Sequence, residues 1–344
     1  MNVSQSVGKW YDLNKRELPW REQKNPYYIW ASEIILQQTR MKQGIVYYYK
    51  FIEKFPTVFD LAHSTVEEVL NIWQGLGYYS RARNMHRAAK QIVDKFHGEF
   101  PSDLKTIRQL PGIGDYSSAA IASLAFNIPV ACIDGNVYRL LARHFGISSF
   151  IDSAGGKKEF MTLATELLDV HHPGRHNQAM IELGAVICLP KHPLCSECPL
   201  KDSCMALKND TIHELPKKKK KLIQVHRYFY YLVIKREGYV YLKQRPEKGI
   251  WALLYDFPLI ETGKKMDIRE LIRLKSWKEL FINTEITIKS ISDEYRHQLS
   301  HQFIHAWFIE MEVNLPLKTI PAREIEYERI DQYPLPRLIE KYLY

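Results

Sequence analysis

The chain has 344 residues, which is enough for roughly two domains. Hydrophobic residues make up 46% of it and charged residues 25%, a balance that supports buried cores and excludes wholesale disorder. The net charge of +9 favours a polyanionic partner, although it would equally suit any basic enzyme. No apolar run approaches about 18 residues, and the N-terminus lacks a basic stretch followed by an apolar one. We therefore expect a soluble, unexported, cytoplasmic protein with no membrane partner.

Residues 1 to about 206 contain short helical patterns separated by Pro and Gly, with little strand-like alternation. Asn25-Pro26 predicts a helix start, with Asn as the cap and Pro as the first helical residue. Further helices are predicted at 65–74, 80–96, 102–110, 116–126, 137–144, 157–168 and 177–186. The first two thirds of the chain are therefore predicted to be all-α.

The composition changes at residues 214–216, which precede five lysines at 217–221. We interpret 214–226 as a basic, solvated linker. Two β-rich runs then flank Arg236-Glu237-Gly238, which predicts a hairpin. A helix is predicted at 267–281, a strand at 303–313 and a closing helix at 336–343. The last third is therefore predicted to be an α/β domain with an antiparallel or mixed sheet.

Four of the five cysteines lie close together, at Cys188, Cys195, Cys198 and Cys204. Their C-x6-C-x2-C-x5-C spacing favours an iron–sulfur cluster, which is typically held by thiolates alone. A four-cysteine zinc site is the alternative, but such sites usually present two C-x2-C pairs and this loop has one. Cys132 lies in an apolar run and is interpreted as a small buried residue.

The segment 104–126 holds two helical stretches joined by residues 110–114. Gly112 and Gly114 permit a tight turn that exposes backbone N–H groups at the start of the second stretch, where the helix dipole favours a phosphate. A plain turn is the alternative. In a basic protein, two helices joined in this way favour non-specific contact with a DNA backbone.

Two carboxylates have the surroundings that acid catalysis needs. Glu33 lies on an apolar helix face beside Ile29, Trp30 and Leu36, so its pKa should rise toward that of a general acid, unless it reaches solvent at the edge of that face. Asp134 directly precedes a helix and is a plain N-cap candidate. A carboxylate at a helix N-terminus also stays ionised, as a group facing a developing cation must.

Six segments and the cysteine loop together carry a resemblance: ELPWR, SEIILQQTR, GLGYYSRARN, LPGIGDYSSAAI, DGNVYRLLAR and NQAMIELGAVIC. Over residues 10–206 the chain resembles the adenine DNA glycosylase (MutY) family of the helix-hairpin-helix glycosylase superfamily. The resemblance implies a base-flipping enzyme that removes adenine opposite 8-oxoguanine or G in duplex DNA. It also implies a monomer that acts on the bacterial nucleoid.

The same resemblance implies a multidomain fold. A catalytic region at 1–213 would comprise an all-α helix-hairpin-helix domain of six helices at about 22–133 and an iron–sulfur domain formed by 1–21 and 134–213. The four cysteines would hold one [4Fe–4S] cluster. Glu33 would protonate adenine and activate water, Asp134 would stabilise the oxocarbenium-like sugar, and Tyr116 and Asn136 would support them. The residues implied to contact DNA or adenine are Arg16, Leu18, Trp20, Arg21, Gln38, Thr39, Tyr78, Gly112 and Gly114.

Residues 227–344 resemble the MutT-like (Nudix-like) domain through which this family recognises 8-oxoguanine. The matching pieces are 249–251, 255–258 and Leu299-Ser300-His301. Because the family often has Phe where Leu299 stands, the contact with the base is expected from Ser300 and His301. A hydrolytic MutT enzyme needs a Glu-rich helix, and no such glutamates follow Arg269-Glu270. The domain should therefore recognise a base and not hydrolyse nucleotides.

Three alternatives remain open at the level of sequence. A glycosylase-lyase of the endonuclease III type carries a Schiff-base lysine at the position of Tyr116, and without that amine strong lyase activity is not expected. A related mismatch glycosylase would act on another lesion, such as thymine in a T:G pair. A non-catalytic iron–sulfur protein would bind DNA without releasing a base, which the pair Glu33 and Asp134 argues against.

Overall fold

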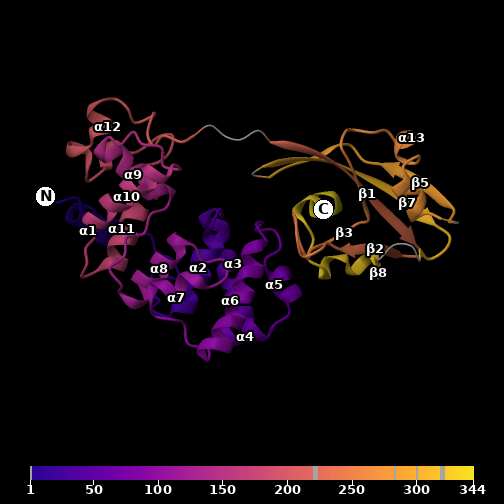
Figure 1. Ribbon diagram of the computed structural model, residues 1–344, viewed down its shortest axis with the longest axis horizontal. Coiled ribbons are helices and arrows are strands. Elements are labelled where there is room, and N and C mark those ends of the chain that lie inside the picture. The colour runs from indigo at the N-terminus through magenta and orange to yellow at the C-terminus, as the bar shows by residue number, and fades with distance from the viewer. Residues whose placement is uncertain (1, 220–223, 283, 300, 318–321) are drawn as a thin grey trace. The chain divides into compact units, whose positions relative to one another are not determined.

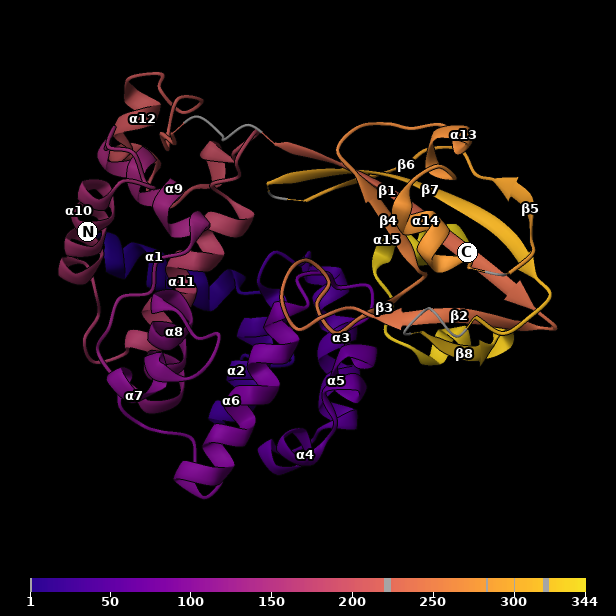
Figure 2. The same cartoon turned by 45° about the vertical axis from the view of Figure 1, so that its right-hand side comes forward.

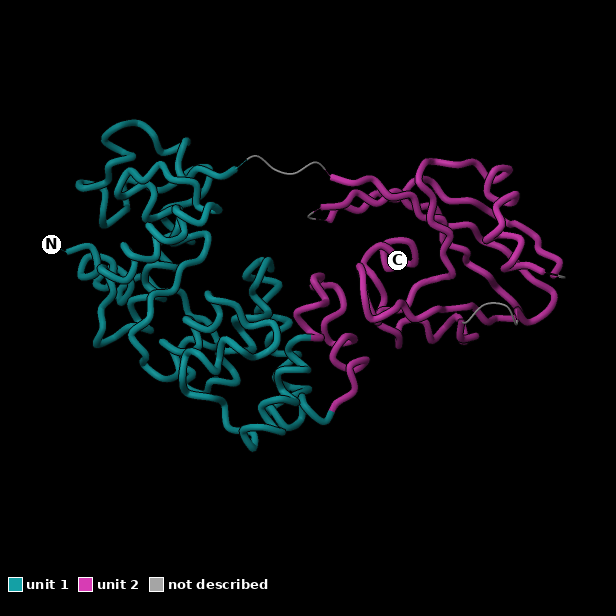
Figure 3. Tube along the Cα trace, viewed as in Figure 1, with its two compact units in different colours: residues 1–63, 84–220 teal, residues 64–83, 221–344 magenta. Residues whose placement is uncertain are grey.

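The computed structural model describes residues 2–219, 224–282, 284–299, 301–317 and 322–344. The chain forms two compact units, one from residues 1–63 and 84–220 and one from residues 64–83 and 221–344 (Figure 3). Within the described ranges, no helix combines the length and the apolar character needed to cross a membrane.

The first unit is all-α, as predicted (Figure 1). Its helices are α1 (Val3–Asn14), α2 (Pro26–Leu36), α3 (Met41–Lys54), α4 (Val58–His63), most of α6 (Ser80–Phe96), α7 (Leu104–Gln109), α8 (Asp115–Phe126), α9 (Gly135–Phe145), α10 (Ala154–Glu166), α11 (Pro173–Val186) and α12 (Met205–Lys208). The Asn25 side chain caps α2 by accepting the Tyr27 N–H at 2.9 Å, which confirms the predicted start. Helices α1, α3, α4 and α12 were not predicted.

The N-terminal helix packs against helices that follow it by more than 120 residues. Val7 and Tyr11 of α1 share one buried cluster with Leu140 and Leu141 of α9 and with Leu183 of α11. Figure 1 shows α1 beside α9, α10 and α11. The first residues of the chain therefore complete the core around the later helices of this unit.

The described part of the predicted linker begins on this first unit. The Lys217 carbonyl accepts the Ile151 N–H at 3.1 Å, and the Lys219 N–H donates to the Asp152 carboxylate at 3.2 Å. The side chains of residues 217–219 are exposed. The backbone is thus bound up to Lys219, while the next four residues lie outside the described ranges.

The second unit is an α/β domain with a mixed sheet, together with residues 64–83. The predicted hairpin is present as β1 (Val225–Arg236) and β2 (Tyr239–Gln244), and β1 runs parallel to β7 (Gln302–Val313). The other pairings among the described strands are antiparallel. Besides β1, β2 and β7, the described strands are β3 (Tyr255–Asp256), β4 (Leu259–Thr262), β5 (Ile286–Ile291), β6 (Tyr295–Gln298) and β8 (Arg323–Glu326).

Both faces of this sheet are covered (Figure 2). Alternate residues of β1 point to opposite faces, as the strand period requires. Phe229 and Tyr231 join the cluster that contains Leu338 of α15 (Arg337–Leu343). Tyr230 and Leu232 join the opposite cluster, which packs against two short helices, α13 (Ile268–Leu271) and α14 (Lys275–Leu280).

The prediction of a single helix at 267–281 is wrong in one respect. It is divided into α13 and α14 because the backbone of Leu274, with φ −63° and ψ 143°, is extended and not helical. Asp267 caps α13 through a capping box with Glu270, so the predicted start is correct. Hydrophobic spacing alone continues across such a break, which is why the sequence pattern did not show it.

Candidate active site

Glu33 lies in the middle of α2 and keeps part of its surface accessible. Burial of its carboxyl raises the pKa to about 7, while a hydrogen bond from the Tyr116 hydroxyl lowers it and the charge of Asp134 raises it. Burial also raises the pKa of Tyr116 well above its usual value, so this hydroxyl keeps its proton and donates a hydrogen bond to the carboxylate. Glu33 can therefore hold a proton near neutral pH, which is the property of a general acid.

Asp134 is the N-cap of α9, as predicted. One carboxylate oxygen accepts the N–H groups of Asn136 and Val137, each at 2.9 Å, and the other accepts the Asn136 side-chain amide at 2.7 Å. Burial nevertheless raises the pKa of Asp134, and the hydrogen bonds and the Arg139 charge only oppose that rise. The helix N-terminus thus orients this carboxylate, but burial outweighs it and raises the carboxylate's pKa.

The extended segment before Asp134 is held by a residue that sequence reasoning missed. The buried Asn177 amide accepts the Cys132 N–H at 3.0 Å and donates to the Val130 carbonyl at 2.9 Å and the Ser123 hydroxyl at 3.0 Å. The bonds to Cys132 and Val130 fix the chain that leads to Asp134, and the bond to Ser123 ties the same amide to α8. A polar amide among apolar residues of a predicted helix was the available signal.

A buried arginine connects the carboxylate site to the cysteine loop. Arg139 donates to the Asn136 side-chain oxygen at 2.8 Å and to the Cys188 carbonyl at 2.6 Å. One turn later, Arg143 donates to the Leu189 carbonyl at 2.7 Å and lies 3.5 Å from the Cys188 sulfur. The sequence placed these two arginines only on a helix. The structure shows that they fix the start of the cysteine loop.

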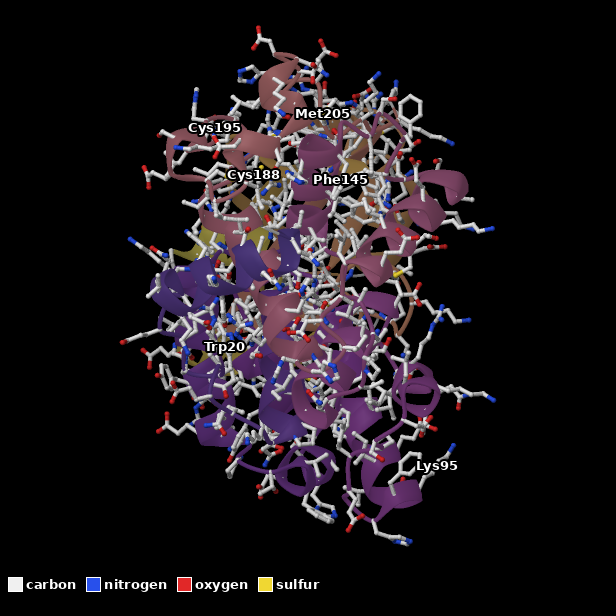
Figure 4. The ribbon with its side chains drawn as sticks, turned by 90° about the vertical axis from the view of Figure 1, so that its left-hand side faces the viewer. Trp20, Lys95, Phe145, Cys188, Cys195 and Met205 are labelled. Atoms are coloured by element: carbon white, nitrogen blue, oxygen red, sulfur yellow. The ribbon has the colours of Figure 1, made fainter. Side chains whose placement is uncertain are left out.

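The four predicted ligand cysteines line one cavity, whose other walls are apolar residues together with Arg143 and His144 of α9 and Lys201 of the loop. Figure 4 shows Cys188 and Cys195 near each other in this part of the first unit. Across the described residues, no three His, Cys, Asp or Glu side chains are arranged to hold a single metal ion. Four thiols around one cavity are the donor set that an iron–sulfur cluster uses.

The predicted pocket residues near the N-terminus converge on a carboxylate that was not predicted. Glu182 of α11, 1% exposed, accepts from Arg16 at 2.7 Å and from Arg21. Trp20 is buried with its ring edge-on to Tyr48 at 5.1 Å between centroids, and Leu18 is half-buried. Burial of an unpaired carboxylate charge costs free energy, so Glu182 needs both arginines as partners.

Two of the residues implied to contact DNA, Gln38 and Tyr78, have an unusual backbone. Gln38 has φ 56° and is exposed. The hydroxyl of the next residue, Thr39, donates to the Gln37 carbonyl at 3.3 Å. Tyr78, in the second unit, has φ 49° and is 52% exposed. Left-handed backbone is uncommon for residues other than glycine and often marks functional positions.

The predicted hairpin turn lies between α7 and α8, and both of its glycines are exposed. Gly112 has φ 78°, and a Cβ there would come within 2.5 Å of the Asn84 Cβ, so only glycine fits. Gly114 caps α8 without a side-chain hydrogen bond. Because glycine has no side chain, Gly114 supplies no capping bond to the first N–H groups of α8.

In the second unit, His301 is exposed between β6 and β7, while Ser300 lies outside the described residues. Leu299, the residue that departs from the family pattern, packs against the cluster on the α15 face of the sheet. Its side chain therefore contributes to the core of this unit.

The structure thus brings Glu33, Tyr116, Asp134 and Asn136 into one constellation.

Two family models match the chain: the HhH-GPD superfamily of base excision DNA repair proteins over residues 31–167, and the NUDIX domain over residues 229–344. Among solved structures, a thermostable thymine-DNA glycosylase is 27% identical with a TM-score of 0.56, covering 60% of this chain and 95% of that one. The expected order of folds, a helix-hairpin-helix core followed by a NUDIX domain, is confirmed.

Curated relatives extend over both regions. The chain is 36% identical over 316 residues to the adenine DNA glycosylase of Buchnera aphidicola subsp. Baizongia pistaciae, a match that covers 90% of this chain and 87% of the relative. It is 42% identical over 210 residues to the adenine DNA glycosylase of Homo sapiens, covering 58% of this chain and 38% of that protein. The chain belongs to the adenine DNA glycosylase family and is an adenine-specific DNA glycosylase of base excision repair.

Proposed function

We propose that this enzyme hydrolyses the N-glycosidic bond of adenine paired with 8-oxoguanine or G in duplex DNA, as a monomer and without strand cleavage. The observation that carries the proposal is the pairing of a protonatable Glu33 with a capped Asp134 around the Tyr116 hydroxyl. One carboxyl holds a proton near neutral pH and the other is fixed by three donors. Two carboxyl groups in different environments are what glycosidic hydrolysis requires.

The proposed reaction begins with a flipped adenine beside Glu33. Protonated Glu33 donates to a ring nitrogen, the bond from the sugar to the base breaks, and the electron pair leaves with the adenine. The resulting oxocarbenium-like sugar faces Asp134, whose position is fixed by Asn136. Ionised Glu33 then accepts a proton from the attacking water. The Tyr116 hydroxyl cannot form a Schiff base, so no lyase step follows.

Single-turnover base release from a panel of duplexes tests the proposed substrate. We expect adenine release from 8-oxoguanine:A and more slowly from G:A, with little from C:A and no thymine release from T:G. Thymine release from T:G would support the related mismatch glycosylases. Tight binding to every duplex with no base release would support the non-catalytic alternative.

The DNA contacts follow from exposed backbone and basic residues. The N–H groups at Gly112 and Gly114 would bind a phosphate at the start of α8. Gln38 and Tyr78 would enter the duplex beside 8-oxoguanine, and Thr39 would contact DNA next to Gln38. Arg16, Leu18, Trp20 and Arg21 would border the flipped adenine, with Glu182 fixing the two arginines.

A [4Fe–4S] cluster fits the cysteine cavity, because all four thiols line it and Arg139 and Arg143 hold its loop. Cys188, Cys195, Cys198 and Cys204 would be the ligands. When bound, the cluster would cross-link this loop and so stabilise the surface it presents to DNA. We propose the corresponding domains: a helix-hairpin-helix domain at about 22–133, an iron–sulfur domain from 1–21 and 134–213, a linker at 214–226 and a base-recognition domain at 227–344.

Replacing a ligand cysteine should remove the cluster. We expect Cys198→Ser to lower the iron and sulfide content well below four per chain, to reduce soluble yield, and to weaken DNA binding more than base release in the protein that folds. Metal analysis and visible absorbance measure the cluster. Cys132→Ser is the matched control, because Cys132 lies outside the cavity and should leave the iron content unchanged. Stoichiometric zinc with no visible absorbance in the wild type would contradict the cluster assignment.

Recognition of 8-oxoguanine is assigned to Ser300 and His301. We expect the double variant Ser300→Ala/His301→Ala to reduce the preference for 8-oxoguanine:A over G:A several-fold to about a hundred-fold, since each lost polar contact costs about 0.5–1.5 kcal/mol or more. The rate at saturating enzyme should change far less. His213→Ala, an exposed histidine of the first unit, is the control. An unchanged preference in the double variant would shift recognition to Gln38 and Tyr78.

A further inference from the structure

Residues 64–83 of the helical part of the chain belong to the same compact unit as the C-terminal domain (Figure 3). They comprise α5 (Val66–Ile72), a turn at 75–79, which we call the insertion turn, and the first turn of α6. The insertion turn carries Tyr78, the residue proposed to enter the duplex. The base-recognition residue His301 lies in this same unit.

The insertion turn has a fixed conformation. Gly75, Gly77 and Tyr78 have φ values of 88°, 72° and 49°. The Gly77 carbonyl accepts the Trp73 indole N–H at 3.2 Å and the Arg81 guanidinium at 3.1 Å. The Arg81 guanidinium also lies 5.7 Å from the centre of the Tyr78 ring. Side chains that precede and follow the turn therefore fix its backbone, while the Tyr78 ring stays half exposed.

The residue after Tyr78 connects this turn to the C-terminal domain. The Tyr79 hydroxyl accepts the Gly75 N–H at 3.3 Å and donates to the Leu335 carbonyl at 3.2 Å. Tyr79 is 4% exposed and Leu335 is fully buried, so water does not compete for these bonds. One hydroxyl thus bridges the start of the insertion turn and the core of the sheet domain.

Three further hydrogen bonds join the same two segments. Arg83 donates to the Ala252 carbonyl at 2.9 Å, and Asn71 donates to the Gln332 carbonyl at 3.1 Å. The Tyr255 hydroxyl donates to the Glu67 carboxylate at 3.3 Å. The contacts therefore flank the insertion turn on both sides along the chain.

The core on the α15 face continues from this contact toward the predicted base-recognition loop. Leu335 belongs to that core, and Leu299, which directly precedes Ser300, packs against the same core. A set of packed side chains therefore lies between the Tyr79 contact and Leu299, which directly precedes the predicted recognition residues in the sequence. Such a set can couple two sites when it has a defined arrangement.

We propose that the C-terminal domain holds the insertion turn through Tyr79, so that recognition of 8-oxoguanine and insertion of Tyr78 occur in one body. Tyr79 is then a positioning residue for specificity, and it touches neither the leaving base nor the sugar. This inference rests on the proposed roles of Tyr78 and of the loop at Ser300 and His301. Its consequence is that the loss of one hydroxyl at Tyr79 weakens the preference for 8-oxoguanine without altering the carboxylate site.

Tyr79→Phe tests the proposal in the full-length enzyme. A 2-aminopurine placed beside the mispair reports local unstacking when Tyr78 inserts, and single-turnover rates on 8-oxoguanine:A and G:A report the preference. We expect a smaller fluorescence change and a loss of preference of about 2- to 30-fold. Tyr230→Phe is the matched control, because its hydroxyl likewise accepts the Met266 N–H and donates to the Met266 carbonyl, on the opposite face of the sheet. Both variants should lower the melting temperature, but only Tyr79→Phe should alter fluorescence and preference. Equal effects of the two variants, or none from Tyr79→Phe, would overturn the proposal.

A double-mutant cycle separates this inference from the function on which it rests. Combining Tyr79→Phe with Ser300→Ala/His301→Ala should change the preference by less than the product of the separate effects, because both act through one body. If the effects multiply, the turn and the recognition loop act independently and the coupling is wrong. If Tyr78→Ala leaves the fluorescence change intact, or the Ser300/His301 variant keeps its preference, the proposed roles themselves fail.

Discussion

Replacing Glu33 with glutamine should abolish adenine release while leaving mispair binding intact. The amide has nearly the same shape as the carboxyl but cannot transfer a proton to the leaving base. General acid catalysis is typically worth about 10²- to 10⁴-fold, so the single-turnover rate should fall by at least that factor. Glu53→Gln, on the exposed surface of α3, is the control for the substitution. A near-normal rate for Glu33→Gln would remove Glu33 from the acid role.

The pH dependence of base release should identify the same group. Because burial raises the pKa of Glu33 to about 7, the protonated fraction falls as pH rises through 7, and the rate should fall with it. The effect on stability has the same direction. With an unfolded pKa near 4.5, the folded state binds the proton more tightly, so this contribution is complete below pH 4.5 and is lost as pH rises through 7. Denaturant unfolding of Glu33→Gln should lack this pH dependence.

Replacing Asp134 with asparagine should be comparably damaging to the rate. The variant keeps a side-chain oxygen for the N–H groups of Asn136 and Val137 but loses the negative charge that faces the sugar. Removal of one electrostatic stabiliser typically costs about 10²- to 10³-fold, measured as single-turnover adenine release. Because the Asp134 charge raises the pKa of Glu33, the remaining activity should also decline at a lower pH than in the wild type.

Asp103→Asn provides a control for the loss of a helix cap. Asp103 caps α7 at the surface by accepting the Thr106 N–H at 2.9 Å, so the same substitution there tests the cap without the chemistry. Both variants should lose little stability, because asparagine is itself a good helix cap. If Asp134→Asn retained a rate close to that of Asp103→Asn, Asp134 would have only a structural role.

The sequence by itself determined those features whose causes are local. Asn25 and Pro26 start α2, Asp134 caps α9, and residues 236–238 turn the β1–β2 hairpin, because each depends on neighbours within about four residues. The cysteine spacing likewise indicated one metal centre, since a short loop can bring its own thiols together. Glu33 was found for a similar reason, because its apolar neighbours lie one helical turn away.

The tertiary structure alone decided the contacts between residues distant in the chain. The hydrogen bond from Tyr116 to Glu33, the enclosure of Glu182 by Arg16 and Arg21, and the Asn177 bonds before Asp134 each join segments that lie far apart in the chain. The division of 267–281 at Leu274 and the placement of 64–83 with the C-terminal domain belong to the same class. Periodicity states which face of an element is buried but not which element covers it. The partners of a buried polar group are therefore fixed only when the helices and the sheet have packed.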